Sequence, residues 1–228
     1  MNASETGRDF HREFVRLFDE TARYHNRARV FDDFIHCAAI ALHNGIPCQY
    51  SGTLEQRYLE IIRGYEQADT GRLARLLALT VEALTAEPHD FLGRVFMALN
   101  MGDAHRGQFF TPWHVTQLMA QLSCADLVAQ LQTKPYVTAC EPCCGAGGMT
   151  IAIAGRVKQA GFSPAHHLWV SCTDIDAVAR CMAYVQLSLL GIAGEVVLGN
   201  VLADERREVW YTPAHYLGNW SFRLNPLR

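Results

Sequence analysis

Acidic, amide and glycine residues follow the ends of three apolar runs in the second half of the chain. Glu141 ends the first run and precedes a turn that contains Gly145, Gly147 and Gly148. Asp174 ends the second run, and Asn200 ends the third. A carboxylate at such a position can accept hydrogen bonds from both ribose hydroxyls, and an amide can reach a base edge. The pattern therefore predicts a site for a nucleoside.

The glycine turn, residues 141–148, differs from the common phosphate-binding loops. A dinucleotide fingerprint places G-x-G-x-x-G directly after the strand, whereas here an acid and a proline come first. No Lys-Ser/Thr pair follows, which excludes a P-loop. Glu141 would repel a pyrophosphate and attract an ammonium group. A ligand with an amino-acid head, a ribose and an adenine fits better, and S-adenosylmethionine is that ligand. A tight turn without any ligand is the alternative that this spacing leaves open.

The elements that position these residues alternate between strands and helices. Strands are predicted at residues 136–140, 168–173 and 195–198, with helices at about 148–160 and 177–190. This alternation is typical of parallel strands joined by right-handed crossovers, and it corresponds to half of a doubly wound nucleotide-binding sheet. In such sheets ligands bind beyond the carboxyl ends of the strands, which is where the acids fall.

A further helix is predicted before the first strand, from residue 111 to about 131. Thr111 is expected to cap it, with Pro112 in its first turn. Residues 1–105 read as helical throughout, because apolar residues recur at helical spacing between Gly and Pro breaks. Two domains follow from this change of pattern: a helical domain at 1–105 and an S-adenosylmethionine-binding domain at 106–228.

Composition limits the functions that the chain can have. The 228 residues are 50% hydrophobic and carry a net charge of −3, so a large DNA footprint of its own is not expected. No apolar signal segment and no membrane-length run is visible, and the eight cysteines are expected to be free thiols in the cytoplasm. Cys140 and Cys143 have zinc-like spacing, but without a second such pair no metal site is predicted.

Residues 107–112 read GQFFTP, and residues 141–148 read EPCCGAGG. In this order the two segments resemble the catalytic subunits of type I restriction-modification systems and related adenine-N6 DNA methyltransferases. The resemblance covers roughly residues 91–200. It implies an α/β fold in which an N-terminal helical bundle precedes a shortened Rossmann-like sheet of the S-adenosylmethionine-dependent methyltransferase type.

The resemblance also implies roles for individual residues. The first segment would close the methionine end of the cofactor through Gln108, Phe109, Phe110, Thr111 and Pro112. The turn would cradle the cofactor through Glu141, Gly145, Ala146, Gly147, Gly148 and Met149. Asp174 would hold the ribose, and Ile175 and Asn200 would flank the adenine.

The chain departs from the family pattern in one respect. The family requires an Asn/Asp-Pro-Pro-aromatic turn after the fourth strand, and the nearest segments here are residues 211–213 and 225–227, which lack the Pro-Pro pair. The resemblance implies methyl transfer to adenine N6 in DNA, with DNA reached through a separate specificity subunit or partner protein. A non-catalytic cofactor-binding relative, acting as a regulator or partner in a restriction-modification or mobile-element system, is the alternative. A methyltransferase for another substrate also stays open.

Overall fold

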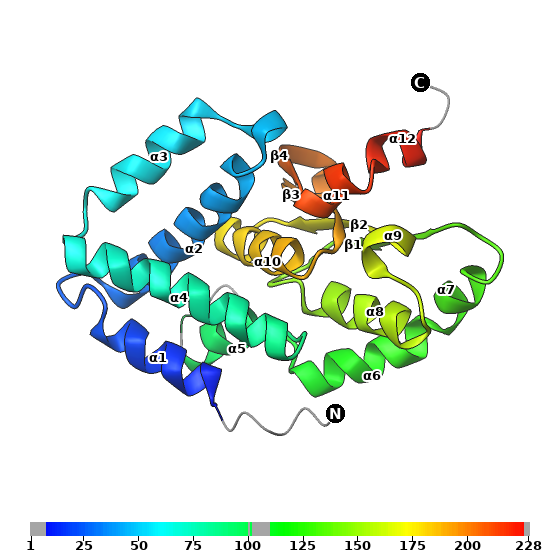
Figure 1. Cartoon of the computed structure of the whole chain (residues 1–228), viewed down its shortest axis with the longest axis horizontal. Coiled ribbons are helices and arrows are strands. Elements are labelled where there is room, and N and C mark those ends of the chain that lie inside the picture. Colours follow the sequence, from blue (N-terminus) through cyan, green and yellow to red (C-terminus); the bar gives the residue numbers. More distant parts are fainter. Residues whose placement is uncertain (1–7, 100, 102–109, 226–228) are drawn as a thin grey trace. The chain divides into compact units, whose positions relative to one another are not determined.

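The computed structural model describes residues 8–99, 101 and 110–225. The chain divides into two compact units, Met1–Phe109 and Phe110–Arg228. The first is built from helices and the second from a sheet with helices, so the predicted α/β class with a helical N-terminal part is confirmed (Figure 1). None of the helices in the described ranges has the length and apolar character that a membrane span needs.

The helices of the first unit are α1 (Phe10–Glu20), α2 (Arg27–Asn44), the short 3-10 helix η1 (Pro47–Gln49), α3 (Gly52–Ile62), α4 (Gln67–Ala86) and α5 (Phe91–Ala98). Four of them begin with a side-chain oxygen that accepts a backbone N–H, which satisfies a donor that a helix start otherwise leaves free. These caps are Asp9, Asn26, Ser51 and Asp90.

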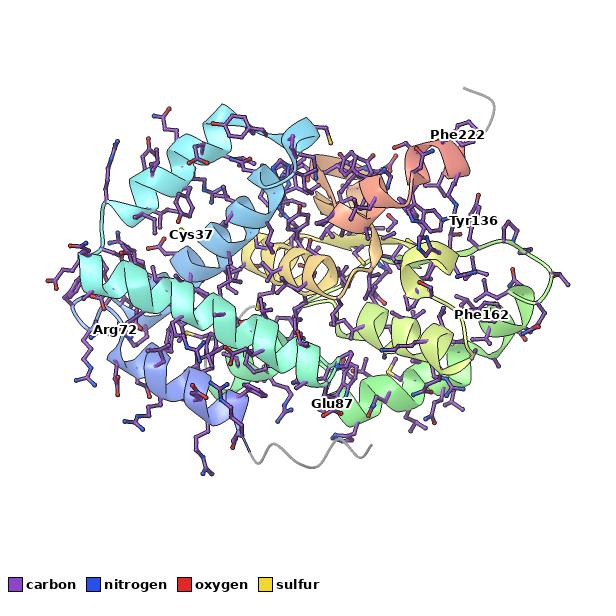
Figure 2. The ribbon with its side chains drawn as sticks, in the orientation of Figure 1. Cys37, Arg72, Glu87, Tyr136, Phe162 and Phe222 are labelled. Atoms are coloured by element: carbon purple, nitrogen blue, oxygen red, sulfur yellow. The ribbon has the colours of Figure 1, made fainter. Side chains whose placement is uncertain are left out.

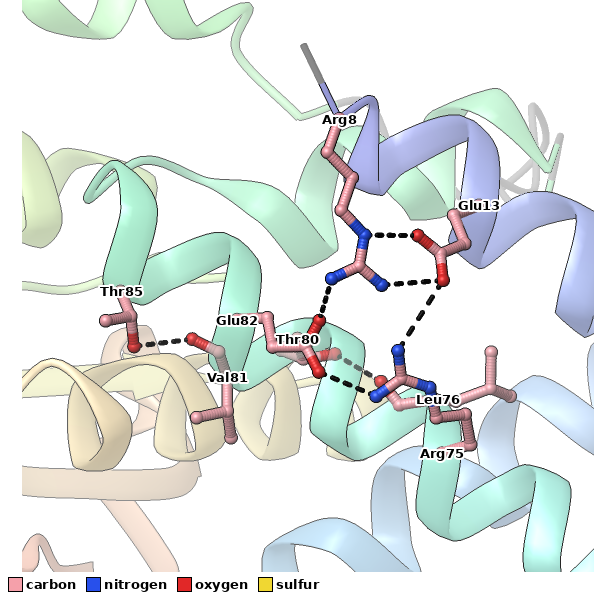
Figure 3. Close-up of polar contacts among 8 residues, drawn as sticks. All are labelled: Arg8, Glu13, Arg75, Leu76, Thr80, Val81, Glu82 and Thr85. Atoms are coloured by element: carbon pink, nitrogen blue, oxygen red, sulfur yellow. Dashed lines mark hydrogen bonds and ion pairs between the residues drawn. The ribbon is translucent and has the colours of Figure 1, made fainter. Parts of the chain in front are cut away.

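Buried aromatic side chains form the core of the first unit. Phe14 packs edge-to-face on Phe34 and Phe91, and Phe31 does the same with Phe18. On the surface, Arg8 joins α1 to α4 because it pairs with both Glu13 and Glu82 (Figure 3). These groups are partly exposed, so the ion pairs contribute little to stability.

The sheet of the second unit has four strands in the order β1-β2-β3-β4. The strands are β1 (Val137–Glu141), β2 (Leu168–Asp174), β3 (Ala193–Asn200) and β4 (Glu205–Tyr211). The first three are parallel, which confirms the predicted crossovers, whereas β4 runs antiparallel to β3. β4 was not predicted, because its charged first half hides the alternation of an edge strand.

Helices cover both faces of this sheet. Cys172 faces α8 (Gly148–Gln159), where it contacts Thr150, and α10 (Ala177–Leu189) packs on the same face. Trp169 points to the opposite face, as residues of the other parity do, and it packs near Trp220. That second face is covered at one end by α9 (Pro164–His167), α11 (Pro213–Leu217) and α12 (Trp220–Leu224).

The predicted helix at 111–131 is two helices, α6 (Trp113–Ser123) and α7 (Ala125–Gln130), which meet at Cys124. Its predicted cap is also wrong. Pro112 occupies the N-cap position in an extended conformation, and no side chain bonds the first turn. The hydroxyl of Thr116 donates to the carbonyls of Thr111 and Pro112, which joins the first turn of α6 to the residues before it but satisfies none of the free N–H groups.

His215 fastens the C-terminal helices to the sheet. The indole N–H of Trp169 donates to His215 Nδ1 at 3.0 Å, and His215 Nε2 lies 2.9 Å from the Ser221 hydroxyl. Because an indole nitrogen only donates, Nδ1 must accept and Nε2 must carry the proton. His215 therefore donates to Ser221 and cannot act as its general base. The pair is structural.

Candidate functional site

The predicted glycine turn leads from the carboxyl end of β1 into α8. Gly145 has φ +54° and Gly147 has φ +92°, a backbone region that residues with a side chain rarely adopt. The N–H of Gly147 donates to the carbonyl of Cys144 at 2.8 Å, which closes the turn, and Gly147 is the N-cap of α8. Ala146, Gly148 and Met149 therefore lie in one continuous turn at the helix start.

Three hydrogen bonds hold this turn to its neighbours. The N–H of Cys144 donates to the carbonyl of Thr173 at 2.9 Å, and that of Gly145 donates to Asp174 Oδ2 at 2.8 Å. The amide of Gln186 on α10 donates to the carbonyl of Ala146 at 2.8 Å. Gln186 is fully buried, and sequence reasoning missed it. A lone glutamine within an apolar helix was the available signal. The turn is thus fixed before any ligand binds.

The aromatic segment reaches the same turn. A Cβ atom placed on Gly145 would lie 2.9 Å from two ring carbons of Phe110, so the ring lies directly on this glycine. Thr111 and Pro112 are exposed just beyond it, at the start of α6. Gln108 and Phe109 lie outside the described residues. The structure therefore brings the part of the segment that it describes onto the glycine turn.

Two half-buried carboxyl groups border the turn. Burial raises the pKa of Glu141, and the Asp174 carboxylate raises it further. Burial also raises the pKa of Asp174, against the opposing effect of the N–H groups of Asp176 and Gly145. Asp174 Oδ2 accepts the N–H of Gly145 and Oδ1 accepts that of Asp176, so the carboxylate is held in place at the end of β2. Two close acids create a potential that attracts a cation.

Ile175 and Asn200 lie at the carboxyl ends of β2 and β3, as the glycine turn lies at the carboxyl end of β1. Ile175 is 61% exposed. The side chain of Asn200 accepts the N–H of Leu202 at 3.0 Å and so caps the 3-10 turn η2 (Val201–Ala203). All the predicted site residues that the structure describes therefore lie at or near the carboxyl ends of the parallel strands. Their contacts to ribose and adenine stay predictions.

Of the two segments closest to the missing catalytic turn, the structure describes residues 211–213 and Asn225, and these lie at the other end of the strands. Tyr211 pairs with Glu195 near the start of β3, and the N–H of Gly194 donates to the hydroxyl of Thr212. Asn225 follows Leu224, which lies beside the start of β1. A five-residue strand separates that end from the glycine turn by about 16 Å. These described residues therefore lie away from a ligand bound at the turn.

The N-6 DNA methylase family matches residues 90–219, which is more than half of the chain and includes every described site residue. The chain belongs to this family. The predicted resemblance is thereby confirmed, and membership implies S-adenosylmethionine as the cofactor. The turn of this methylase family member fits such a group, because it leads from the carboxyl end of β1 into the start of α8 and two half-buried acids border it.

A Listeria monocytogenes protein described as a class I S-adenosylmethionine-dependent methyltransferase is similar to this methylase family member in structure. The identity is 14% and the TM-score 0.41, over 81% of this chain and 51% of that protein. The chain thus spans about half the length of that protein. No curated protein matches the chain. Within the described part of the chain, no group of three or more His, Cys, Asp or Glu side chains could hold a metal ion.

Proposed function

We propose that the chain binds S-adenosylmethionine at the glycine turn and transfers its methyl group to adenine N6 in DNA. The observation that carries this proposal is the Phe110 ring lying on Gly145, which joins the two segments of the family pattern in one site. When bound, the cofactor supplies an electrophilic methyl group on its sulfonium. The net charge of −3 supports access to DNA through a separate specificity subunit or partner protein.

Each site residue has a task in this proposal. Glu141 faces the ammonium of the cofactor, and the turn from Gly145 to Met149 lies along its amino-acid part. Asp174 accepts the ribose hydroxyls, while Ile175 and Asn200 flank the adenine. Phe110 forms an apolar wall at the methionine end, where the Thr111 hydroxyl and the backbone of the segment bind the carboxylate of the cofactor. None of the eight cysteines, all of which the structure describes, forms a disulfide, which supports a reducing compartment such as the cytoplasm.

One observation favours a second candidate function. No two of the eight prolines are adjacent, so the sequence contains no Pro-Pro pair, and the nearest substitute that the structure describes in full, residues 211–213, lies beside the start of β3 and away from the glycine turn. The alternative is a non-catalytic relative that binds the cofactor and serves as a regulator or partner in a restriction-modification or mobile-element system. Both candidates use the same cofactor site and differ only in methyl transfer.

Two measurements test these proposals in order. Calorimetric titration with S-adenosylmethionine should give saturable binding that Asp174→Ala weakens and Asp126→Ala, an exposed control on α7, leaves unchanged. Absence of binding by the wild type would refute both candidates. Incubation with tritiated cofactor and unmethylated DNA then separates them. Label in adenine N6 supports the enzyme, and binding without transfer, even with a specificity subunit added, supports the regulator.

A further inference from the structure

The two ends of the parallel strands are covered differently. Tyr136, just before β1, packs edge-to-face on Trp220 of α12, and its hydroxyl donates to the carbonyl of Arg223 at 2.9 Å (Figure 2). At the carboxyl ends of the strands, by contrast, Ile175 is 61% exposed and Leu202 of η2 is fully exposed. A contact that holds the backbone at this end therefore shapes a surface that a ligand can meet, and not the packing of the core.

The strand β4 departs from regular pairing close to that surface. Arg206 and Glu208 pair with consecutive residues of β3, so Arg207 between them is an extra residue in the ladder. Glu208 forms an ion pair with Arg180 on α10. Arg206 instead reaches Glu195, on the opposite face of the sheet, at 2.8 Å. Residues two apart in an uninterrupted strand share a face. Arg207 is therefore the extra residue of a β-bulge, a feature that re-aims side chains next to binding sites.

The sequence of the β3–β4 hairpin accounts for this bulge. A Cβ atom at Gly199 would overlap the carbonyl oxygen of Glu205, so a residue without a side chain is needed where β4 approaches β3. Asn200 then caps η2, and Asp204 has φ +51°, a left-handed conformation that turns the chain into β4. The hairpin thus carries both Asn200 and Arg207 in positions that its own backbone fixes.

The Arg207 side chain contacts the other flank of the candidate site. Its Nη2 donates to the carbonyl of Ile175 at 3.3 Å, and the contact crosses β3 because Ile175 follows β2. Its Nε lies 3.6 Å from the Glu205 carboxylate, which orients the guanidinium. Ile175 comes directly after Asp174, the residue expected to hold the ribose. The hydrogen bond therefore ties the loop after β2 to the β3–β4 hairpin.

We propose that Arg207 is a positioning residue for the adenosine half of the cofactor. It joins the loop that carries Ile175 to the hairpin that carries Asn200, and so sets the distance between the two residues that flank the adenine. Arg207 acts through the Ile175 backbone and does not itself touch the cofactor. The inference rests on the proposed cofactor site and adds to it the element that shapes its adenosine end.

Hydrogen exchange of the ligand-free chain tests the hydrogen bond first. Arg207→Met keeps a long side chain but has no N–H to donate. The amides of residues 175–177 should exchange about threefold to tenfold faster in this variant, as expected for the loss of one hydrogen bond. Lys158→Gln, an exposed control on α8, removes the same charge and should exchange like the wild type. Equal exchange in Arg207→Met and the wild type overturns the proposal, whether or not the chain binds a cofactor.

Calorimetry then tests the consequence for binding, after far-UV circular dichroism has shown that each variant is folded. Methylthioadenosine contains the adenosine part of the cofactor without its amino-acid part. Arg207→Met should weaken the binding of methylthioadenosine and of S-adenosylmethionine by the same factor, about threefold to tenfold. Lys158→Gln should change neither affinity.

Two results of this titration overturn the proposal. Unchanged affinity of Arg207→Met for both compounds would show that the hydrogen bond plays no part in binding. A loss confined to S-adenosylmethionine would show that Arg207 acts by its charge on the amino-acid end. A wild type that binds neither compound refutes the proposed function as well, and the exchange experiment distinguishes that outcome from a missing hydrogen bond.

Discussion

Gly145→Ala tests the contact on which the candidate site depends. At φ +54° an alanine costs about 1–2 kcal/mol because its Cβ meets its own backbone. The new Cβ would also lie 2.9 Å from two carbons of the Phe110 ring, so the ring must move. Such overpacking adds about 1–3 kcal/mol. We expect lower stability in urea unfolding and at least a tenfold loss of cofactor affinity by calorimetry, about 1.4 kcal/mol.

Two glycines elsewhere in the same unit separate the contributions. Gly191 has φ +65° and no atom within 4 Å of the position that an alanine Cβ would take, so Gly191→Ala reports the backbone cost alone. Gly155 has open space and an ordinary helical φ, and Gly155→Ala should be neutral or stabilising. If Gly145→Ala is no more destabilising than Gly191→Ala, and binds cofactor as the wild type does, the Phe110 contact is refuted.

Three further predictions concern single side chains. Gln186→Met leaves the buried Ala146 carbonyl without its donor. The free energy of unfolding in urea should therefore fall by about 1–3 kcal/mol, and the cofactor affinity should fall with it. No change in either quantity would contradict a role for this hydrogen bond in holding the turn. Because burial raises the pKa of Asp174, cofactor binding measured by calorimetry should weaken on acidification at a higher pH than an exposed aspartate would give, and Asp174→Asn should flatten that profile. Burial lowers the pKa of His215 below 6.5, with Glu195 opposing, so the unfolded chain takes up this proton first. The contribution of His215 to stability is therefore present above pH 6.5 and is lost as the pH falls towards the lowered pKa. Between pH 7.5 and 5.5, the free energy of unfolding in urea should fall less in His215→Asn than in the wild type.

The sequence was most informative where one local pattern determined the structure. The apolar runs before Glu141 and Asp174 became β1 and β2, because short runs rich in apolar and β-branched residues between turn residues favour strands. It failed where the deciding contact was distant. Nothing local marks the break at Cys124, which packs between α6 and α8, or shows that Gln186 turns inward to Ala146. A polar residue in a mostly apolar helix gives the same local sequence pattern whether its side chain faces water or a buried carbonyl.

The glycine turn should not depend on the outward side chains of β1. The turn is held by Thr173, Asp174 and Gln186, on β2 and α10, and none of these bonds involves β1. Cys140 also points to the opposite sheet face from Glu141, because side chains alternate along a strand. The Thr138→Lys, Cys140→Lys variant should therefore bind the cofactor with wild-type affinity in calorimetry. Loss of binding by a folded variant would show that β1 supports the turn, and that the tethers seen here are not sufficient to hold it.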